Sequence, residues 1–134
     1  MADTPDSSSV FMEQQDGDGL LLVEGYGGGG FRFLGKRFDG SVLVTETGFF
    51  PVSANSVAEL APADIEGLLT GGVKPEILLV GTGDRMALLP ADFRNYLLAQ
   101  GINGEPMDTG AASRTFNVLR MEDRKVAALL IQVD

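Results

Sequence analysis

The sequence contains neither cysteine nor histidine. Without cysteine there is no thiol nucleophile, disulfide, redox pair or thiolate zinc site. Without histidine there is no imidazole to serve as acid, base or metal ligand, which also excludes Ser-His-Asp and Cys-His catalytic arrangements. Any catalysis would have to use Asp, Glu, Lys, Tyr, Ser or Thr side chains alone. Most hydrolase designs are therefore excluded.

Long apolar runs are also missing, since no stretch approaches the roughly 20 residues that a membrane-spanning helix needs. Residues 1–19 contain five acidic and no basic side chains, unlike a secretory signal or an Arg-rich transit peptide. These absences predict a cytoplasmic protein. Residues 1–19 are also rich in Ser, Asp and Gly and lack hydrophobic periodicity, so we expect them to form a flexible acidic tail.

Basic residues are scarce, with 10 Lys and Arg against 19 Asp and Glu, which gives a net charge of −9. Residues 1–66 have 11 acids against 3 bases, whereas residues 67–134 have 8 acids against 7 bases. A field of this sign repels a phosphate backbone, so no nucleic-acid partner is expected. An acidic excess also simply keeps a chain soluble, an alternative that needs no partner.

The amino half of the chain has the pattern of an antiparallel β-hairpin region. The chain has the length of one domain, which we place at residues 20–134. Apolar segments separated by glycine-rich turns predict strands at residues 20–24, 31–34 and 41–45. Residues 49–52 are predicted as an apolar connection. A helix is predicted at residues 62–70, because proline begins this segment and two glycines follow it.

The carboxyl half changes to an alternation of strands and helices. Two continuous apolar runs, Ile77–Val80 and Val126–Ile131, predict strands that are covered on both faces. Helices are predicted at residues 90–100, with Phe93, Leu97 and Leu98 inward, and at residues 109–121. A short strand is predicted at residues 104–107. This alternation predicts a three-layer α/β fold with a mixed central sheet flanked by helices.

Two loops leave the carboxyl ends of neighbouring predicted strands, which is where open α/β sheets tend to bind ligands. The helix at residues 109–121 would point free backbone amides and a partial positive charge into this crevice. A carboxylate or phosphate could bind there, with Arg114 or Arg124 as a fork. The candidate residues of this crevice are Gly81, Thr82, Gly83, Asp108, Thr109, Arg114, Asn117 and Arg124.

The same residues also have a purely structural interpretation. Asp108 or Thr109 would cap the helix, Arg114 would pair with a nearby acid, and Asn117 would bind a loop backbone. As an enzyme site the crevice is poor, because about 20 Å of helix separates Asp108 from Glu122 at 1.5 Å per residue.

No cofactor or metal is expected from the sequence. The glycines at residues 25–30 precede a predicted strand, and a phosphate-binding loop would lead into a helix. We therefore expect them to form a hairpin turn. The acidic segment Asp16–Gly19 is too short for a calcium loop and lacks its final Glu.

Several segments resemble the complex I assembly factor three family. They are Pro75–Gly83 (PEILLVGTG), Gly101-Ile102, Met107–Thr109, Ala112–Leu119 (AASRTFNVL), Glu122–Ala128 (EDRKVAA) and the hairpin Phe31–Val44. The resemblance covers about residues 20–132 and implies a three-layer α/β fold with a mixed sheet. For the mitochondrial members it implies a role in assembling the peripheral arm of NADH:ubiquinone oxidoreductase through partner proteins. It supplies no catalytic residues.

The mitochondrial members have a targeting leader that this sequence does not show, so the chain is similar to a bacterial member. We expect a non-catalytic binding or assembly factor that acts on protein partners, in the assembly of respiratory complex I or a related membrane complex. One alternative is a small-molecule or anion-binding domain, or an enzyme, that uses the crevice at Gly81–Gly83 and Thr109–Arg114. Another is a homo-oligomer that pairs exposed sheet edges.

Overall fold

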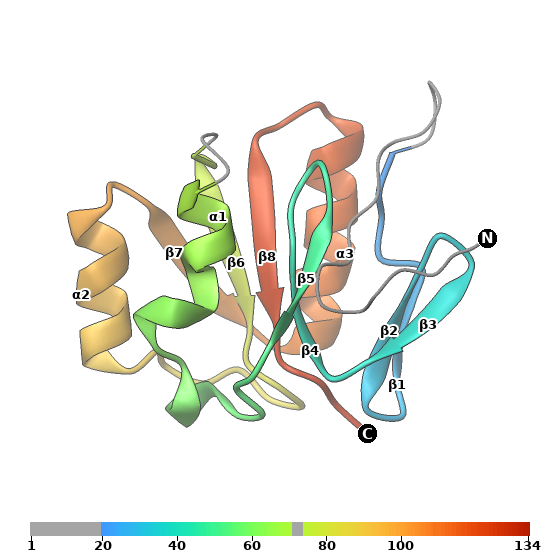
Figure 1. The fold of residues 1–134 in the computed structure, drawn as a ribbon, viewed down its shortest axis with the longest axis horizontal. Helices are drawn as coiled ribbons and strands as arrows, with labels where there is room; N and C mark the ends of the chain where they lie inside the picture. The colour runs from blue at the N-terminus through green and yellow to red at the C-terminus, as the bar shows by residue number, and fades with distance from the viewer. Residues whose placement is uncertain (1–19, 71–73) are drawn as a thin grey trace.

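The computed structural model describes residues 20–70 and 74–134 (Figure 1). The predicted flexible tail at residues 1–19 lies outside the described residues. The described strands form a three-stranded sheet of order β1-β2-β3 and a five-stranded sheet of order β5-β4-β8-β6-β7. That residues 20–134 form one domain stays a prediction.

The three-stranded sheet is antiparallel throughout, as the hairpin pattern predicted. It consists of β1 (Gly25–Gly27), β2 (Gly30–Phe33) and β3 (Lys36–Asp39). The turn between β1 and β2 has positive φ angles of 61° at Gly28 and 84° at Gly29, which glycine adopts without steric cost. Phe31 and Phe33 lie on one side of β2 and are buried, so this side of the sheet faces the core.

The five-stranded sheet is mixed, and its bounds are β4 (Ser41–Val44), β5 (Phe49–Val52), β6 (Ile77–Gly81), β7 (Asn103–Met107) and β8 (Val126–Leu130). β8 lies in the centre, antiparallel to β4 and parallel to β6, and β6 is parallel to β7. Every residue of β8 is buried, as are the last four of β6. The prediction of two neighbouring strands covered on both faces is confirmed.

Helices cover both faces of the five-stranded sheet (Figure 1). The helical segments are η2 (Val57–Glu59), η3 (Pro62–Ile65), α1 (Glu66–Thr70), α2 (Ala91–Ala99) and α3 (Thr109–Met121). One apolar cluster joins α1 and α2 to the sheet through residues such as Leu68 and Phe93. A second cluster joins α3 and the three-stranded sheet to the other face through residues such as Phe33 and Phe116. The three-layer α/β fold is thus confirmed. None of the helices in residues 20–70 and 74–134 combines the length and the hydrophobicity that a membrane span requires.

The predicted strand at Leu20–Glu24 is wrong, because the first strand begins at Gly25. Leu21 and Val23 are buried in the second apolar cluster, so the apolar pattern reflects packing and not strand pairing. The backbone of Val23 bonds to the side chain of Asn117 instead of to another strand. Periodicity alone does not separate these two reasons for burial.

Two further predictions need correction. The apolar connection at residues 49–52 is the edge strand β5, which pairs with β4 in the register Val44↔Phe49 to Ser41↔Val52. Leu98 was predicted on the inner face of its helix, yet 65% of its surface is exposed. In α2 the buried positions are Phe93 and Leu97, four residues apart, and Leu98 lies about 100° further around the helix.

Candidate functional site

The predicted crevice lies where β6 and β7 end side by side. These parallel strands are in register from Ile77↔Asn103 to Gly81↔Met107, so the loops that follow them meet. The backbone N–H of Thr82 donates to the carbonyl of Met107 at 2.8 Å. The structure therefore brings Gly81–Gly83 together with Met107–Thr109, as the sequence predicted.

Thr109 fills this crevice with its own side chain. The residue is fully buried, and its Oγ1 donates to the Ile131 carbonyl at 2.7 Å and accepts from the Gly83 N–H at 3.0 Å. The Thr109 N–H also donates to the Gly83 carbonyl at 2.9 Å. A β-carbon on Gly81 would lie 2.9 Å from Thr109 Cα, so only glycine permits this approach. The crevice is closed by internal hydrogen bonds.

The remaining polar groups at the strand ends also serve the fold. Thr82 Oγ1 donates to the Arg85 carbonyl at 2.6 Å and accepts from the Ala87 N–H at 3.0 Å, which shapes the loop after β6. Asp108 is the N-cap of α3, and its carboxylate accepts from the Ala111 N–H at 2.8 Å. Asp108, and not Thr109, is thus the cap that the structural interpretation required.

Arg114 reaches from α3 to the three-stranded sheet. Its Nη1 lies 3.4 Å from the hydroxyl of Tyr26 on β1. The same hydroxyl lies over Gly110, where a β-carbon would collide with it. The first turns of α3 are therefore in contact with β1, and Arg114 lies at this junction.

Asn117 and Arg124 do not belong to the crevice. The Asn117 amide bonds to the Val23 backbone, which is the structural role considered for it. Arg124 follows the carboxyl end of α3, about 20 Å of helix away from Thr109, and its Nε lies 3.5 Å from a Glu76 carboxylate oxygen. A helix separates its two ends by its full length, so both ends cannot serve one small ligand.

A metal site is not evident in the described part of the chain. Among residues 20–70 and 74–134, no three carboxylate side chains lie close enough together to hold a metal ion.

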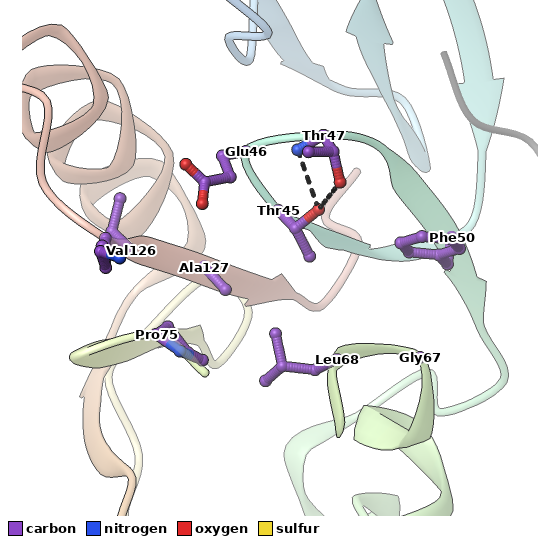
Figure 2. A pocket seen from close by; sticks show the side chains of 10 residues that line it. Thr45, Glu46, Thr47, Phe50, Gly67, Leu68, Pro75, Val126 and Ala127 are labelled. Carbon is purple, nitrogen blue, oxygen red and sulfur yellow. Dashed lines mark hydrogen bonds between the residues drawn. The ribbon is translucent and has the colours of Figure 1, made fainter. Parts of the chain in front are cut away.

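Two hollows occur elsewhere on the described surface. One, of about 140 Å³, opens at the opposite end of the five-stranded sheet beside the turn that contains Thr45 and Thr47, with Phe50, Leu68 and Val126 in its wall (Figure 2). The other, of about 210 Å³, lies on the three-stranded sheet and is lined by Gly25, Tyr26, Phe31, Arg32 and Arg37.

None of the eight residues predicted for the crevice lines either hollow. Arg32 and Arg37 were overlooked because their proximity depends on how two strands pair. The available signal was the pair of basic residues flanking a short turn at Leu34-Gly35, since a hairpin places the residues on either side of its turn opposite one another.

The sequence matches the family described as "Protein of unknown function (DUF498/DUF598)" over residues 23–131. An uncharacterized protein of Rhodobacter capsulatus is 34% identical over 113 residues, which cover 84% of this chain and 86% of that protein. NADH dehydrogenase (ubiquinone) 1 alpha subcomplex assembly factor 3 of Xenopus tropicalis is 29% identical over 124 residues, which cover 92% of this chain and 68% of that protein.

A solved structure shares the same fold. The crystal structure of an outer membrane protein from Bartonella henselae superposes with a TM-score of 0.79 at 38% identity, covering 85% of this chain and 96% of that chain. The resemblance to the complex I assembly factor three family, inferred from sequence motifs, is confirmed by the Xenopus relative. The chain belongs to the DUF498/DUF598 family.

Proposed function

We propose that this protein is a non-catalytic binding factor that acts through protein partners in the assembly of respiratory complex I (NADH:ubiquinone oxidoreductase), or of a related membrane complex. The observation that carries the proposal is the alignment with a protein named as a complex I assembly factor over 92% of this chain. Because the alignment extends along nearly the whole chain, the shared part includes both sheets and all three layers.

The geometry of the strand ends supports a binding role over catalysis. Thr82, Asp108 and Thr109 each use their side-chain oxygens in hydrogen bonds within the chain. Their partners are backbone groups, so none of these oxygens is paired with a side chain that could activate it as a nucleophile. The described surface offers shallow hollows and exposed side chains instead, as expected of a protein that binds other proteins.

The proposal also includes a cytoplasmic location. Fractionation of native cells tests this part of the proposal. We expect to recover the protein in the cytoplasmic fraction, or to release it from the membrane fraction with salt. A protein that remains in membranes after salt and carbonate washes would contradict it.

Affinity capture of the full chain from native cells under mild salt tests the assembly role. We expect complex I subunits or assembly proteins to be recovered with the wild-type chain. A Phe116→Asp variant is a suitable control, because it places a charge at a fully buried position of the second apolar cluster and so disrupts the fold. Recovery of the same amount of complex I subunits with the wild-type chain and with the Phe116→Asp variant would contradict the proposal. Recovery of none with the wild-type chain would also contradict it.

The alternative of a small-molecule or anion-binding domain, or an enzyme, at Gly81–Gly83 and Thr109–Arg114 receives less support. The buried Thr109 side chain occupies the space between the two loops. Arg114, the cation of the predicted site, is exposed beside Tyr26. An anion would have to bind at this junction, outside the crevice itself.

A further inference from the structure

The side of the three-stranded sheet opposite Phe31 and Phe33 carries two neighbouring arginines. The register places Arg32 of β2 directly opposite Arg37 of β3, with Gly25 of β1 on the other side of Arg32. The next row of the same side contains two glycines and Asp39. Glycines leave the backbone bare, so the two arginine side chains dominate this surface.

Like charges directly opposite one another are normally unfavourable in a sheet. Here the cost is offset mostly by carbonyl groups. Arg32 Nη1 donates to the Gly35 carbonyl at 2.7 Å, and Arg37 donates through Nη1 and Nη2 to the carbonyls of Gly27 and Gly28. Carbonyls hold a guanidinium in place but leave its charge uncompensated.

The nearby carboxylates compensate only part of this charge. Asp39 bonds to Arg37 Nε at 2.9 Å, and its side chain is 84% exposed, so the pair is screened by solvent. Glu24 accepts from the Gly35 N–H at 2.8 Å and forms no ion pair with Arg32. Among the described residues, Arg32 is therefore held by a carbonyl alone.

The two arginines line the hollow of about 210 Å³, together with Gly25, Tyr26 and Phe31. The Tyr26 side chain lies on the other side of the sheet, in the same row as Phe31, and its hydroxyl lies 3.4 Å from Arg114 Nη1. Arg32 and Arg37 are therefore the two cations on this side of the three strands, in a chain whose net charge is −9. We call this surface the arginine hollow.

We propose that the arginine hollow binds an acidic segment of a protein partner, with the partner's carboxylates placed on Arg32 and Arg37. The inference rests on the proposed function and names the chemistry of its partner. Arg32 is held toward the β2–β3 turn and Arg37 toward the β1–β2 turn, so the two guanidinium groups are directed to opposite ends of β2. A segment with two or more carboxylates can meet both, and each guanidinium has unused N–H groups to donate.

The net charge of the chain and the charges of the two arginines act on an acidic partner at different distances. At long range the net charge of −9 repels an acidic partner, whereas at physiological salt charges more than about 8 Å apart are largely screened. Local attraction by the arginines then decides the outcome. Affinity for an acidic segment is expected to be lost at high salt, while an apolar contact would not be.

A nuclear magnetic resonance titration of the full chain with acetylated hexaglutamate tests the proposal. We expect the backbone resonances of Gly25, Tyr26 and Phe31 to shift, and the dissociation constant to rise at least fivefold between about 50 and 300 mM salt, on the order expected for a few charge contacts. Arg32→Gln should weaken binding about tenfold. Arg94→Gln is the matched control, since Arg94 is exposed on α2, on the opposite side of the molecule (Figure 1), and should change affinity less than twofold.

Several results would overturn the proposal. One is that the peptide shifts backbone resonances outside the arginine hollow. Another is that the Arg32→Gln and Arg94→Gln variants bind the peptide with equal affinity. Arg32→Lys guards against misfolding, because it keeps the charge and should retain most of the affinity. Concentration-dependent shifts at the hollow without peptide would assign it to a second copy. Shifts caused by replacing the five acids of residues 1–19 with amides would assign it to the chain's own amino end.

The two proposals can fail separately. If the peptide does not bind but the wild-type chain captures complex I proteins, the assembly role stands and the arginine hollow is not its interface. If the peptide binds at the hollow and no complex I protein is captured, the acidic-segment site stands and its partner belongs to another process. Both proposals are supported when Arg32→Gln, but not Arg94→Gln, reduces the capture of complex I proteins.

Discussion

The side-chain amide of Asn117 forms two hydrogen bonds with the backbone of Val23, 94 residues earlier in the chain. The Val23 N–H donates to Asn117 Oδ1 at 2.8 Å, and Asn117 Nδ2 donates to the Val23 carbonyl at 2.8 Å. An amide presents the same donor and acceptor as a peptide group, so Asn117 takes the place of a neighbouring strand. Through this pair, α3 holds the segment that leads into β1.

Asn117→Ala should therefore destabilise the protein by about 1–3 kcal/mol, because it leaves a part-buried N–H and carbonyl of Val23 without partners. Asn117→Asp should be nearly as harmful, since a carboxylate cannot donate to the carbonyl. Asn95→Ala is the matched control, at an exposed position of α2. Urea denaturation measures the change in the free energy of unfolding. Equal stability of the Asn117→Ala and Asn95→Ala variants would contradict this role.

Gly81→Ala should destabilise the protein by roughly 1–3 kcal/mol, through overpacking against the backbone of Thr109. The added β-carbon would lie 2.9 Å from Thr109 Cα, and backbone cannot move aside as a flexible side chain can. Gly67→Ala provides the comparison. Its β-carbon would meet the Phe50 ring at 3.8 Å and Leu43 Cδ2 at 4.0 Å, which are ordinary contacts, and alanine in α1 should be neutral or stabilising by up to about 1 kcal/mol. Thermal unfolding followed by circular dichroism distinguishes the two, and a stable Gly81→Ala variant would refute the close approach.

Arg120 is buried at 7% exposure near the carboxyl end of α3, and its Nε has no hydrogen-bond partner among the described residues. Its partner carboxylate, Glu46 on the turn after β4, lies 3.9 Å from Nη1. Replacing a poorly paired buried cation with an apolar side chain is often neutral or stabilising. Arg120→Met should thus keep or raise the free energy of unfolding.

Glu46→Ala should instead lower the free energy of unfolding by about 1–2 kcal/mol, because it leaves the buried guanidinium without its counter-ion. The double variant should resemble Arg120→Met alone, since Glu46 has no charge to neutralise once Arg120 is gone. Chemical denaturation of the three variants completes a double-mutant cycle. A coupling free energy near zero would show that the pair does not interact.

Self-association through the five-stranded sheet should be absent, because each free edge carries a proline. The Met107 carbonyl accepts from Thr82 across β6, so alternation directs the neighbouring Pro106 outward. The Thr45 N–H donates to the Gly48 carbonyl, and alternation from Gly48 likewise turns Pro51 away from β4. Proline has no N–H for a further strand.

Light scattering should show no concentration-dependent oligomer of this kind. A variant with Pro51→Val and Pro106→Val should associate more strongly than wild type, because both edges regain a donor. An oligomer of the wild-type chain that persists after charged substitutions on both edges would show that another surface is responsible.

Anion binding at the strand ends predicts a defined effect for Arg114. If inorganic phosphate binds at the junction of Arg114 and Tyr26, Arg114→Ala should weaken it by about 1–3 kcal/mol, the scale of a charged hydrogen bond. Isothermal titration measures the affinity, with Arg124→Ala as the control, because Arg124 lies at the far end of α3 beside Glu76. A wild-type chain that does not bind phosphate would remove this alternative.

The sequence by itself determined the two central parallel strands, β6 and β8, and the start of α3. The apolar runs in β6 and β8 are long enough to identify strands covered on both faces, and Asp108 marks the start of α3 because a side-chain cap is a local interaction. Both conclusions depend on residues close together in the chain. The missing thiols and imidazoles restrict the available chemistry whatever fold the chain adopts.

Only the tertiary structure decided what the polar residues near the strand ends do. That Thr109 fills the crevice, that Asn117 replaces a strand beside Val23, and that Arg32 lies opposite Arg37 all depend on contacts whose partners local patterns do not specify. A hydroxyl, an amide or a guanidinium satisfies an internal bond as readily as an external ligand. Which of the two it meets is settled by packing, and packing here closed the predicted crevice and left the arginines exposed.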